Sequence, residues 1–258
     1  MPRSFYRLSN LLQTSIRRTK HTMSEQQQRK LELIQNITDV KAAMATVPHH
    51  QKARLVAVSK YKPAEDLMHV YETGHRHFGE NYVQELVEKS TKLPSDIQWH
   101  FIGHLQSNKC KTVAAIPNLF AVETVDSIKK ADTLNKACIS CERKEPLRVF
   151  VQVNTSREEA KSGVDPESCT QVCQHIQANC PQLTLQGLMT IGMFGRDPSE
   201  TNPDFECLVD CKKKTESMMP GTDLELSMGM SGDYLQALKA GSTNIRVGTT
   251  IFGARPKK

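Results

Sequence analysis

The stretch LVAVSK, residues 55–60, decides how the whole chain is interpreted. Four consecutive apolar residues, two of them β-branched, are typical of a strand buried in a parallel sheet, and Lys60 stands where that strand ends. An ammonium group is costly to bury, so Lys60 must be paired, must reach solvent along its own stem, or must have a lowered pKa. Lysines with a lowered pKa act as amine nucleophiles and form Schiff bases with carbonyl compounds.

The rest of the chain alternates between short apolar runs and amphipathic stretches. Apolar runs bounded by turn residues indicate strands, and a period of 3.6 residues indicates helices. We expect strands at 55–59, 76–79, 97–102, 119–122, 147–153, 184–188, 223–226 and 244–247. We expect helices at 64–73, 82–92, 106–114, 126–139, 166–179, 203–218 and 233–240.

Eight such strand and helix units predict one fold. Regular alternation predicts a parallel sheet, and eight units in about 250 residues predict a single closed (β/α)8 TIM barrel. The alternative is an open doubly wound sheet, which often carries a glycine-rich dinucleotide motif after its first strand. In this chain that position holds KYKP, residues 60–63, so the barrel is favoured.

An extra N-terminal helix is expected at 24–46, before the first strand, with Ser24 as its N-cap. The apolar residues expected on one side of this helix are Leu31, Ile34, Ile37 and Met44. Residues 24–258 are therefore expected to form one barrel domain that includes this helix.

The charge of the chain is unevenly distributed. The net charge is +6, and residues 1–22 supply five of these positive charges because they contain five Lys or Arg and no Asp or Glu. The remainder is nearly neutral, which argues against a dedicated nucleic-acid-binding protein. No apolar run is long enough to span a bilayer, so no membrane insertion is expected.

Residues 1–23 form a basic leader in front of the expected barrel. This segment is rich in Arg, carries Ser and Thr, and spaces its leucines as a helix does, which is the composition of a mitochondrial transit peptide. A disordered basic tail is the alternative. A product that starts at Met23 would lack the segment, so we expect a cytoplasmic location, a mitochondrial location, or both.

The eight cysteines occur without a secretory signal, so reduced thiols are expected. Cys138 and Cys141 form a lone CxxC, without a second pair at zinc-ribbon spacing. The pairs at 169/173 and 207/211 lie four residues apart on expected helices, and Cys110 has no evident activating partner. We therefore predict structural thiols and no metal site.

The working face of a barrel lies at the carboxyl ends of its strands. The residues expected there are Lys60, Glu80, Asn81, residues 100–104, Asn154, Met189, residues 227–231 and residues 246–249. Lys60 is the only lysine among them. His100 lies within an apolar strand and is expected to be a hydrogen-bonded core histidine. Asn81 and Asn154 either orient a cofactor ring or cap loops.

The loops after strands 7 and 8 are where barrels commonly bind phosphate. Both loops here contain small residues, GMSG at 229–232 and GTT at 248–250. Gly248 lets the backbone approach an anion, and the hydroxyls of Ser231 and Thr249 can donate to phosphate oxygens. Arg246 precedes the second loop and either forms a core salt bridge or donates to the ring nitrogen of a pyridine cofactor.

Seven stretches resemble the pyridoxal phosphate homeostasis proteins, single-domain relatives of the alanine racemase N-terminal barrel. They are AVSKYKPAE (57–65), HFGENYVQEL (77–86), WHFIGHLQSNK (99–109), QVNTSREEAKSG (152–163), GLMTIG (187–192), LSMGMSGDY (226–234) and STNIRVGTTIFGAR (242–255). The resemblance runs from the first strand to the end of the chain.

This resemblance implies a cofactor site for pyridoxal 5'-phosphate. It implies an internal aldimine on Lys60 and a phosphate held between Ser231, Gly248 and Thr249. It also implies that the pyridine nitrogen of the cofactor contacts Arg246, with Asn81 and Met189 near the ring. No catalytic residue is assigned. The implied role is to bind the cofactor, buffer it or hand it to apo-enzymes, and so keep vitamin B6 pools in balance, as a monomer or weak dimer.

A weak amino-acid racemase is the alternative function. Racemisation needs acid/base groups on both faces of the substrate, and alanine racemases take the second, a tyrosine, from an additional C-terminal domain. Only five residues follow Gly253 in this sequence, so we expect no such tyrosine and little turnover. A third possibility, an aldolase-like Schiff-base enzyme, predicts a sugar-phosphate adduct and no bound chromophore.

Overall fold

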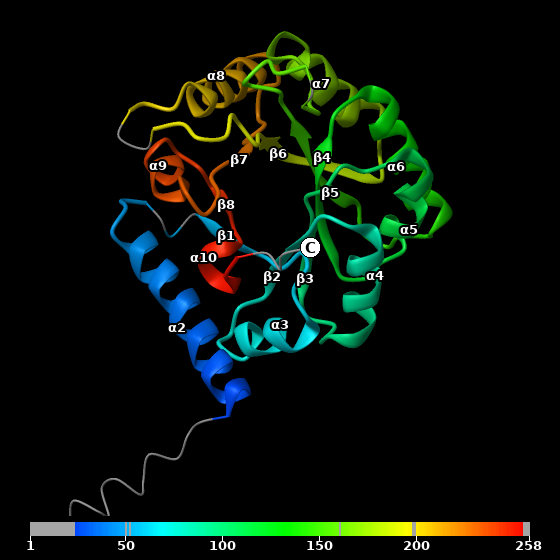
Figure 1. Ribbon diagram of the computed structural model, residues 1–258. Coiled ribbons are helices and arrows are strands. Elements are labelled where there is room, and N and C mark those ends of the chain that lie inside the picture. Colours follow the sequence, from blue (N-terminus) through cyan, green and yellow to red (C-terminus); the bar gives the residue numbers. More distant parts are fainter. Residues whose placement is uncertain (1–23, 50, 52, 160, 198–199, 255–258) are drawn as a thin grey trace, which may run out of the picture.

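The computed structural model describes residues 24–49, 51, 53–159, 161–197 and 200–254. Eight parallel strands form a closed barrel in chain order, and the last strand pairs with the first (Figure 1). The strands are β1 (Arg54–Val58), β2 (His77–Glu80), β3 (Gln98–Phe101), β4 (Leu119–Val125), β5 (Leu147–Gln152), β6 (Leu183–Met189), β7 (Glu225–Ser227) and β8 (Asn244–Val247). The predicted (β/α)8 barrel is confirmed.

Helices lie around these strands, and all but the first form the outer ring (Figure 1). They are α2 (Glu25–Ala45), α3 (Ala64–Tyr71), α4 (Val83–Lys92), α5 (Cys110–Ala114), α6 (Ile128–Ser140), α7 (Cys169–Asn179), α8 (Pro203–Met218), α9 (Tyr234–Lys239) and α10 (Thr249–Phe252). Two short 3-10 turns, η2 (Ser107–Lys109) and η3 (Pro166–Ser168), precede α5 and α7. None of the helices in the described ranges is long and apolar enough to cross a membrane.

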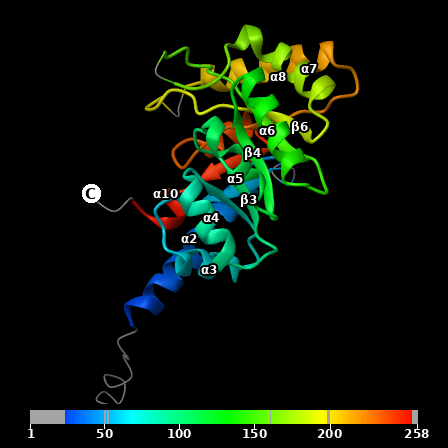
Figure 2. The same ribbon diagram turned by 90° about the vertical axis from the view of Figure 1, so that its right-hand side faces the viewer.

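The N-terminal helix α2 lies outside the ring, beside α3 and α10 (Figures 1 and 2). It begins with the expected cap, because Ser24 and Gln27 form a reciprocal capping box. Arg29 ties α2 to both neighbours: it donates to Asp66 of α3 at 2.7 Å and to the carbonyl of Phe252 at 2.8 Å. The helix therefore braces the segment that follows β8.

The predicted buried side of α2 is partly wrong. The buried residues are Leu33, Ile37, Val40 and Met44, whereas Leu31 is 55% exposed. Residues that are two positions apart in an α-helix point about 200° away from each other around the helix axis, so Leu31 and Leu33 cannot share a face. The i, i+4, i+7 spacing from Leu33 defines the side that packs on the barrel.

The strand and helix boundaries otherwise differ from expectation by a few residues. β4 continues to Val125, beyond the expected end at residue 122, and β7 begins at Glu225, after the expected start at 223. The four-residue helix α10 was not predicted. The basic leader, residues 1–23, lies outside the described residues.

The core has two parts. The larger part is the apolar layer between strands and helices, which includes Trp99, Phe78 and Leu67. The smaller lies inside the barrel around Ala121, Phe150 and Met189. Buried polar side chains share that interior, so the barrel encloses a hydrogen-bonded network as well as apolar contacts.

Candidate functional site

Lys60 stands just beyond the end of β1, next to residues from both neighbouring strands. The register between β1 and β2 puts it level with Asn81, because Val58 pairs with Gly79. On the other side, Gly248 at the end of β8 packs closely on β1, since a Cβ there would lie 3.3 Å from the Cβ and the carbonyl oxygen of Val58. The barrel therefore brings Lys60, Asn81 and Gly248 together.

The backbone beside Lys60 is held by a buried ion-pair cluster. The ammonium of Lys89 donates to the Ser59 carbonyl at 2.9 Å, to Glu80 at 2.7 Å and to Glu85 at 2.8 Å. The hydroxyl of Ser59 also donates to Glu80, at 2.6 Å. Burial raises the pKa of Glu80, and its contacts with Lys89 offset part of that effect. The cluster fixes the residue that precedes Lys60.

The residue after Lys60 has an uncommon backbone conformation. Tyr61 has a φ of 63°, a backbone conformation that residues other than glycine rarely adopt. Its N–H donates to Glu85 at 2.9 Å. Such conformations persist where surrounding contacts hold them, and they cluster at ligand sites. Both neighbours of Lys60 are thus constrained, so its side chain leaves the strand end in a defined direction.

The two loops predicted to bind phosphate are joined to each other. The Ser231 hydroxyl oxygen accepts hydrogen bonds from the N–H groups of Gly248 at 3.1 Å and Thr250 at 3.4 Å. Its own hydrogen remains available to donate to an anion. The N–H of Thr249, the first residue of α10, has no acceptor inside its own helix. Ser231, Gly248 and Thr249 therefore lie together.

The first loop depends on Gly229. This residue has φ of +95°, and a Cβ there would lie 2.5 Å from the Cβ of Ala237 in α9. Any other residue would be strained and would clash. The glycine lets the loop after β7 turn sharply toward the loop after β8.

Arg246 points into the barrel and is 4% exposed. Its Nη1 donates to the Ser227 hydroxyl at 2.6 Å and its Nη2 to the Thr190 carbonyl at 2.8 Å. Burial lowers the pKa of Arg246, although a guanidinium stays charged at neutral pH. No carboxylate of the described residues forms a salt bridge with it, so the core salt bridge considered from the sequence is not found. A guanidinium has five N–H groups, and some remain free to donate to a ligand.

A buried network balances the charge of Arg246. Glu123 accepts hydrogen bonds from His100 Nδ1 at 2.6 Å, from the Ser227 hydroxyl at 2.5 Å and from Asn244 Nδ2 at 3.0 Å. Burial alone would raise the pKa of Glu123, but the His100 hydrogen bond and the Arg246 charge lower it overall. Burial lowers the pKa of His100, which is the hydrogen-bonded core histidine expected from the sequence.

The sequence interpretation missed Glu123. The strand was expected to end at residue 122, one position earlier, and the alternation in LFAVETV, residues 119–125, was the available signal. It also missed Lys89, because a lysine on an amphipathic helix normally lies at the surface. Neither residue is recognisable as functional until the strands are placed side by side.

The remaining predicted residues fall in different places. Met189 is fully buried inside the barrel, next to the residue whose carbonyl binds Arg246. Asn81 has a buried side-chain oxygen without a hydrogen-bond partner among the described residues. Asn154 serves its own loop, because its Nδ2 donates to the Glu158 carbonyl at 3.0 Å. Cys110 is buried in the wall, as expected of a structural thiol.

A cavity of about 570 Å³ opens at the opposite, amino-terminal end of the barrel. Its lining includes Lys41 of α2, Arg54 of β1, and the histidines His75 and His77. None of the predicted site residues lines it, so it is separate from the site at the carboxyl ends of the strands.

The comparisons with known proteins agree with this fold. The family model described as alanine racemase, N-terminal domain, matches residues 31–256. The pyridoxal phosphate homeostasis protein of Schizosaccharomyces pombe is 50% identical over 203 residues, 78% of this chain and 84% of that protein. The human protein of the same name is 48% identical over 230 residues, 84% of this chain and 82% of that protein.

Solved structures of other proteins have the same fold. PipY of Synechococcus elongatus with PLP bound is 32% identical, with a TM-score of 0.74 over 86% of this chain and 100% of that one. Alanine racemase of Corynebacterium glutamicum, at 16% identity and a TM-score of 0.68 over 87% of this chain and 62% of that one, shares the fold. The chain belongs to the alanine racemase N-terminal-domain family and, within it, to the pyridoxal phosphate homeostasis proteins.

Proposed function

We propose that this protein binds pyridoxal 5'-phosphate and takes part in its homeostasis, with the cofactor bonded covalently to Lys60. The observation that carries the proposal is the convergence of three groups at one end of the barrel. These are an amine just beyond the end of β1, a cradle of N–H and hydroxyl groups after β7 and β8, and a buried guanidinium on β8. The PLP-bound relative, at 32% identity over 86% of this chain, supports it.

The unpaired oxygen of Asn81 supports a ligand at this end of the barrel. A buried polar atom without a partner is costly, so a group that supplies a hydrogen bond to it would be favoured. The residues present fit pyridoxal phosphate, because its aldehyde needs an amine, its phosphate needs N–H and hydroxyl donors, and its ring nitrogen accepts a hydrogen bond.

Each residue then has a separate task. Lys60 supplies the amine, and Ser231, Gly248 and Thr249 hold the phosphate. Arg246 donates to the ring nitrogen, and Asn81 and Met189 contact the ring. When bound, the cofactor supplies an electron-accepting ring, and an Arg donor at the nitrogen keeps that ring unprotonated and weakly accepting.

The test of binding is a visible absorbance spectrum of the purified protein with and without added pyridoxal phosphate. An absorbance band in the violet region that the wild type shows and Lys60→Ala lacks supports covalent binding. Retention of the same band in Lys60→Ala, or no band in the wild type, contradicts it. Lys62→Ala is the matched control, because Lys62 lies two residues on and donates to the Ala254 carbonyl.

The proposed role is non-enzymatic, as a store that passes cofactor to pyridoxal-phosphate-dependent apo-enzymes. The fold shared with alanine racemase makes a weak racemase the second candidate. Racemisation needs an acid/base group on each face of the substrate, and among the predicted site residues only Lys60 has a suitable side chain. We expect no Lys60-dependent interconversion of D- and L-alanine, and we expect the loaded protein to reactivate an apo-enzyme. A Lys60-dependent rate would favour the racemase.

We also propose that residues 1–23 target the chain to mitochondria and that a product lacking them is cytoplasmic. The segment's basic, acid-free composition supports this proposal. A fluorescent reporter fused after residue 23 would enter mitochondria, and a reporter on a chain that starts at Met23 would not. The same location for both reporters would contradict this proposal.

We expect the protein to be a monomer or weak dimer by light scattering.

A further inference from the structure

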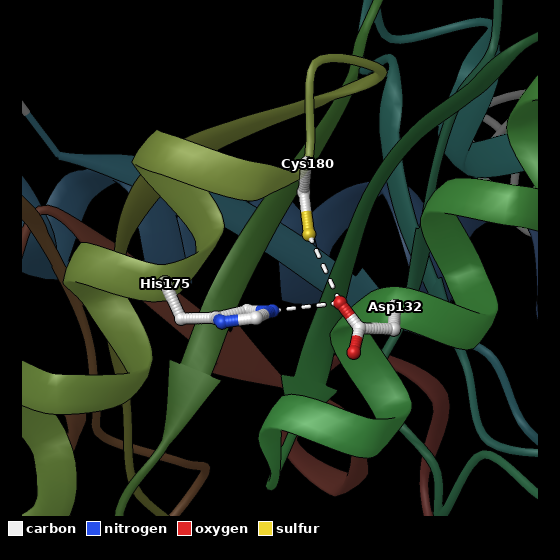
Figure 3. A group of neighbouring side chains, drawn as sticks. All are labelled: Asp132, His175 and Cys180. Carbon is white, nitrogen blue, oxygen red and sulfur yellow. Dashed lines mark hydrogen bonds and ion pairs between the residues drawn. The ribbon is translucent and has the colours of Figure 1, made fainter.

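Three side chains with metal-binding atoms meet on the outer wall of the barrel. Asp132 lies on α6, His175 lies on α7, and Cys180 follows the last turn of α7. His175 Nε2 is 2.7 Å and Cys180 Sγ is 3.8 Å from the same oxygen, Asp132 Oδ1 (Figure 3). The three ligand atoms all lie within 4.8 Å of one another. In the described part of the chain, no other group of three such residues converges in this way.

The nitrogen, oxygen and sulfur atoms of this group are the ligands that zinc prefers. In a tetrahedral zinc site with bonds of about 2.0–2.3 Å, neighbouring ligand atoms lie about 3.3–3.6 Å apart. The sulfur-to-oxygen distance of 3.8 Å is already close to that value. The nitrogen-to-oxygen distance of 2.7 Å must lengthen by about 0.6 Å to admit an ion. The Asp132 side chain is 42% exposed and can move outward by that amount.

A neighbouring amide is placed to orient the histidine. Asn179 Nδ2 lies 3.3 Å from His175 Nδ1, on the side of the ring away from Asp132. If His175 binds a metal through Nε2, its proton moves to Nδ1 and needs an acceptor. A half-turn of the Asn179 amide places its oxygen there, and the two orientations have nearly the same shape. Metal-binding histidines commonly have such a second partner.

We propose that Asp132, His175 and Cys180 form a zinc site whose fourth position is open to water. Zinc binding displaces the proton of the Cys180 thiol to solvent, and a His175 ring that binds the ion through Nε2 carries its proton on Nδ1. The Asp132 carboxylate and the Cys180 thiolate then balance the two charges of the ion. Cys180 is almost fully buried, whereas the other two side chains are partly exposed, so the ion enters from the solvent side.

The proposed site is distinct from the cofactor site. Cys180 precedes β6, and Met189 ends that strand, so the seven-residue strand separates the two ends of the barrel by about 20 Å. A bound ion would fasten α6 to the end of α7 and to the turn that leads into β6. The proposal does not depend on pyridoxal phosphate binding.

The test uses Zn²⁺ and Co²⁺ as probes of the full-length protein, reduced with a phosphine and freed of metal by a chelator. Zinc affinity is measured by competition with a chromophoric chelator, and cobalt reports sulfur coordination by a near-ultraviolet charge-transfer band. We expect one ion per chain. We expect the band to disappear in Cys180→Ser and the affinity to fall at least about 100-fold in His175→Gln and Asp132→Asn.

Cys141→Ser is the matched control, because its thiol lies at the end of α6 and contacts the Lys111 carbonyl instead. This control should keep both the band and the affinity, and Lys60→Ala should keep them as well. If the wild type binds no zinc, or if Cys180→Ser and the partly exposed His175→Gln both bind as the wild type does, the proposal is wrong. Circular dichroism of each variant separates loss of binding from loss of folding.

Discussion

Replacing Glu123 with glutamine tests whether the buried network supports Arg246. Glu123→Gln keeps the shape of the side chain and removes one buried negative charge. In the native protein both carboxylate oxygens accept hydrogen bonds, from His100, Asn244 and Ser227. The amide nitrogen of glutamine instead faces donors at one of these positions, so at least one hydrogen bond is lost.

The expected loss of stability follows from these contacts. A hydrogen bond to a charged group contributes about 1.5–3 kcal/mol. Removal of one partner of a buried charge pair costs about 3–5 kcal/mol, because the other charge is left without compensation. The Glu123 charge reaches Arg246 through Ser227 rather than by direct contact. We therefore expect Glu123→Gln to lower the free energy of unfolding by about 3 kcal/mol.

The assay is urea unfolding at several pH values, followed by circular dichroism. The pKa of Glu123 is lowered in the folded state, so its contribution is present near neutral pH and is lost as pH falls through that lowered value. The difference between wild type and Glu123→Gln should therefore be largest near pH 7 and should shrink in acid. Glu88→Gln, at an exposed pair with Lys92, is the control and should leave the midpoint unchanged. A loss below about 1 kcal/mol, or one that does not change with pH, would show that the Glu123 charge does not stabilise the fold in this way.

Two further substitutions test buried titratable side chains elsewhere in the barrel. Burial lowers the pKa of His75 from 6.5 to about 4, so the unfolded chain binds a proton that the folded protein does not, and stability should fall by about 3 kcal/mol as pH drops from 6.5 to 4. His75→Gln should flatten that part of the stability profile, and an unchanged slope would contradict the assignment. Lys89→Met removes the cation beside buried Glu80 and should cost about 3–5 kcal/mol in urea unfolding, with part of the loss recovered by adding Glu80→Gln. If Lys89→Met alone were as stable as the wild type, that result would show that Glu80 is protonated in the folded protein.

The fold could be predicted because each β/α unit is visible locally. The apolar run before Lys60 and the seven later strand and helix patterns required no knowledge of distant contacts. The candidate site followed because the carboxyl ends of parallel strands meet at one end of a barrel. The positions of Ser231, Gly248 and Arg246 therefore could be anticipated from strand order.

The contacts that support the site could not be predicted in the same way. Glu123 and Ser227 are 104 positions apart, and only the closure of the barrel brings them together. The grouping of Asp132 with His175 and Cys180 likewise joins two helices, so the spacing rules that predicted no metal site did not consider it. Leu31 was misplaced because two overlapping helical periods fit α2, and packing against α3 and α10 selects one of them.

The most direct test of cofactor attachment to Lys60 is reduction of the cofactor-loaded protein with borohydride, followed by peptide mass mapping. We expect the reduced cofactor on the peptide containing Lys60, close to one per chain. We expect folded Lys60→Ala to carry none above the background on surface lysines. Cofactor spread over several lysines, or none on Lys60, would show that the amine at the end of β1 is not the point of attachment.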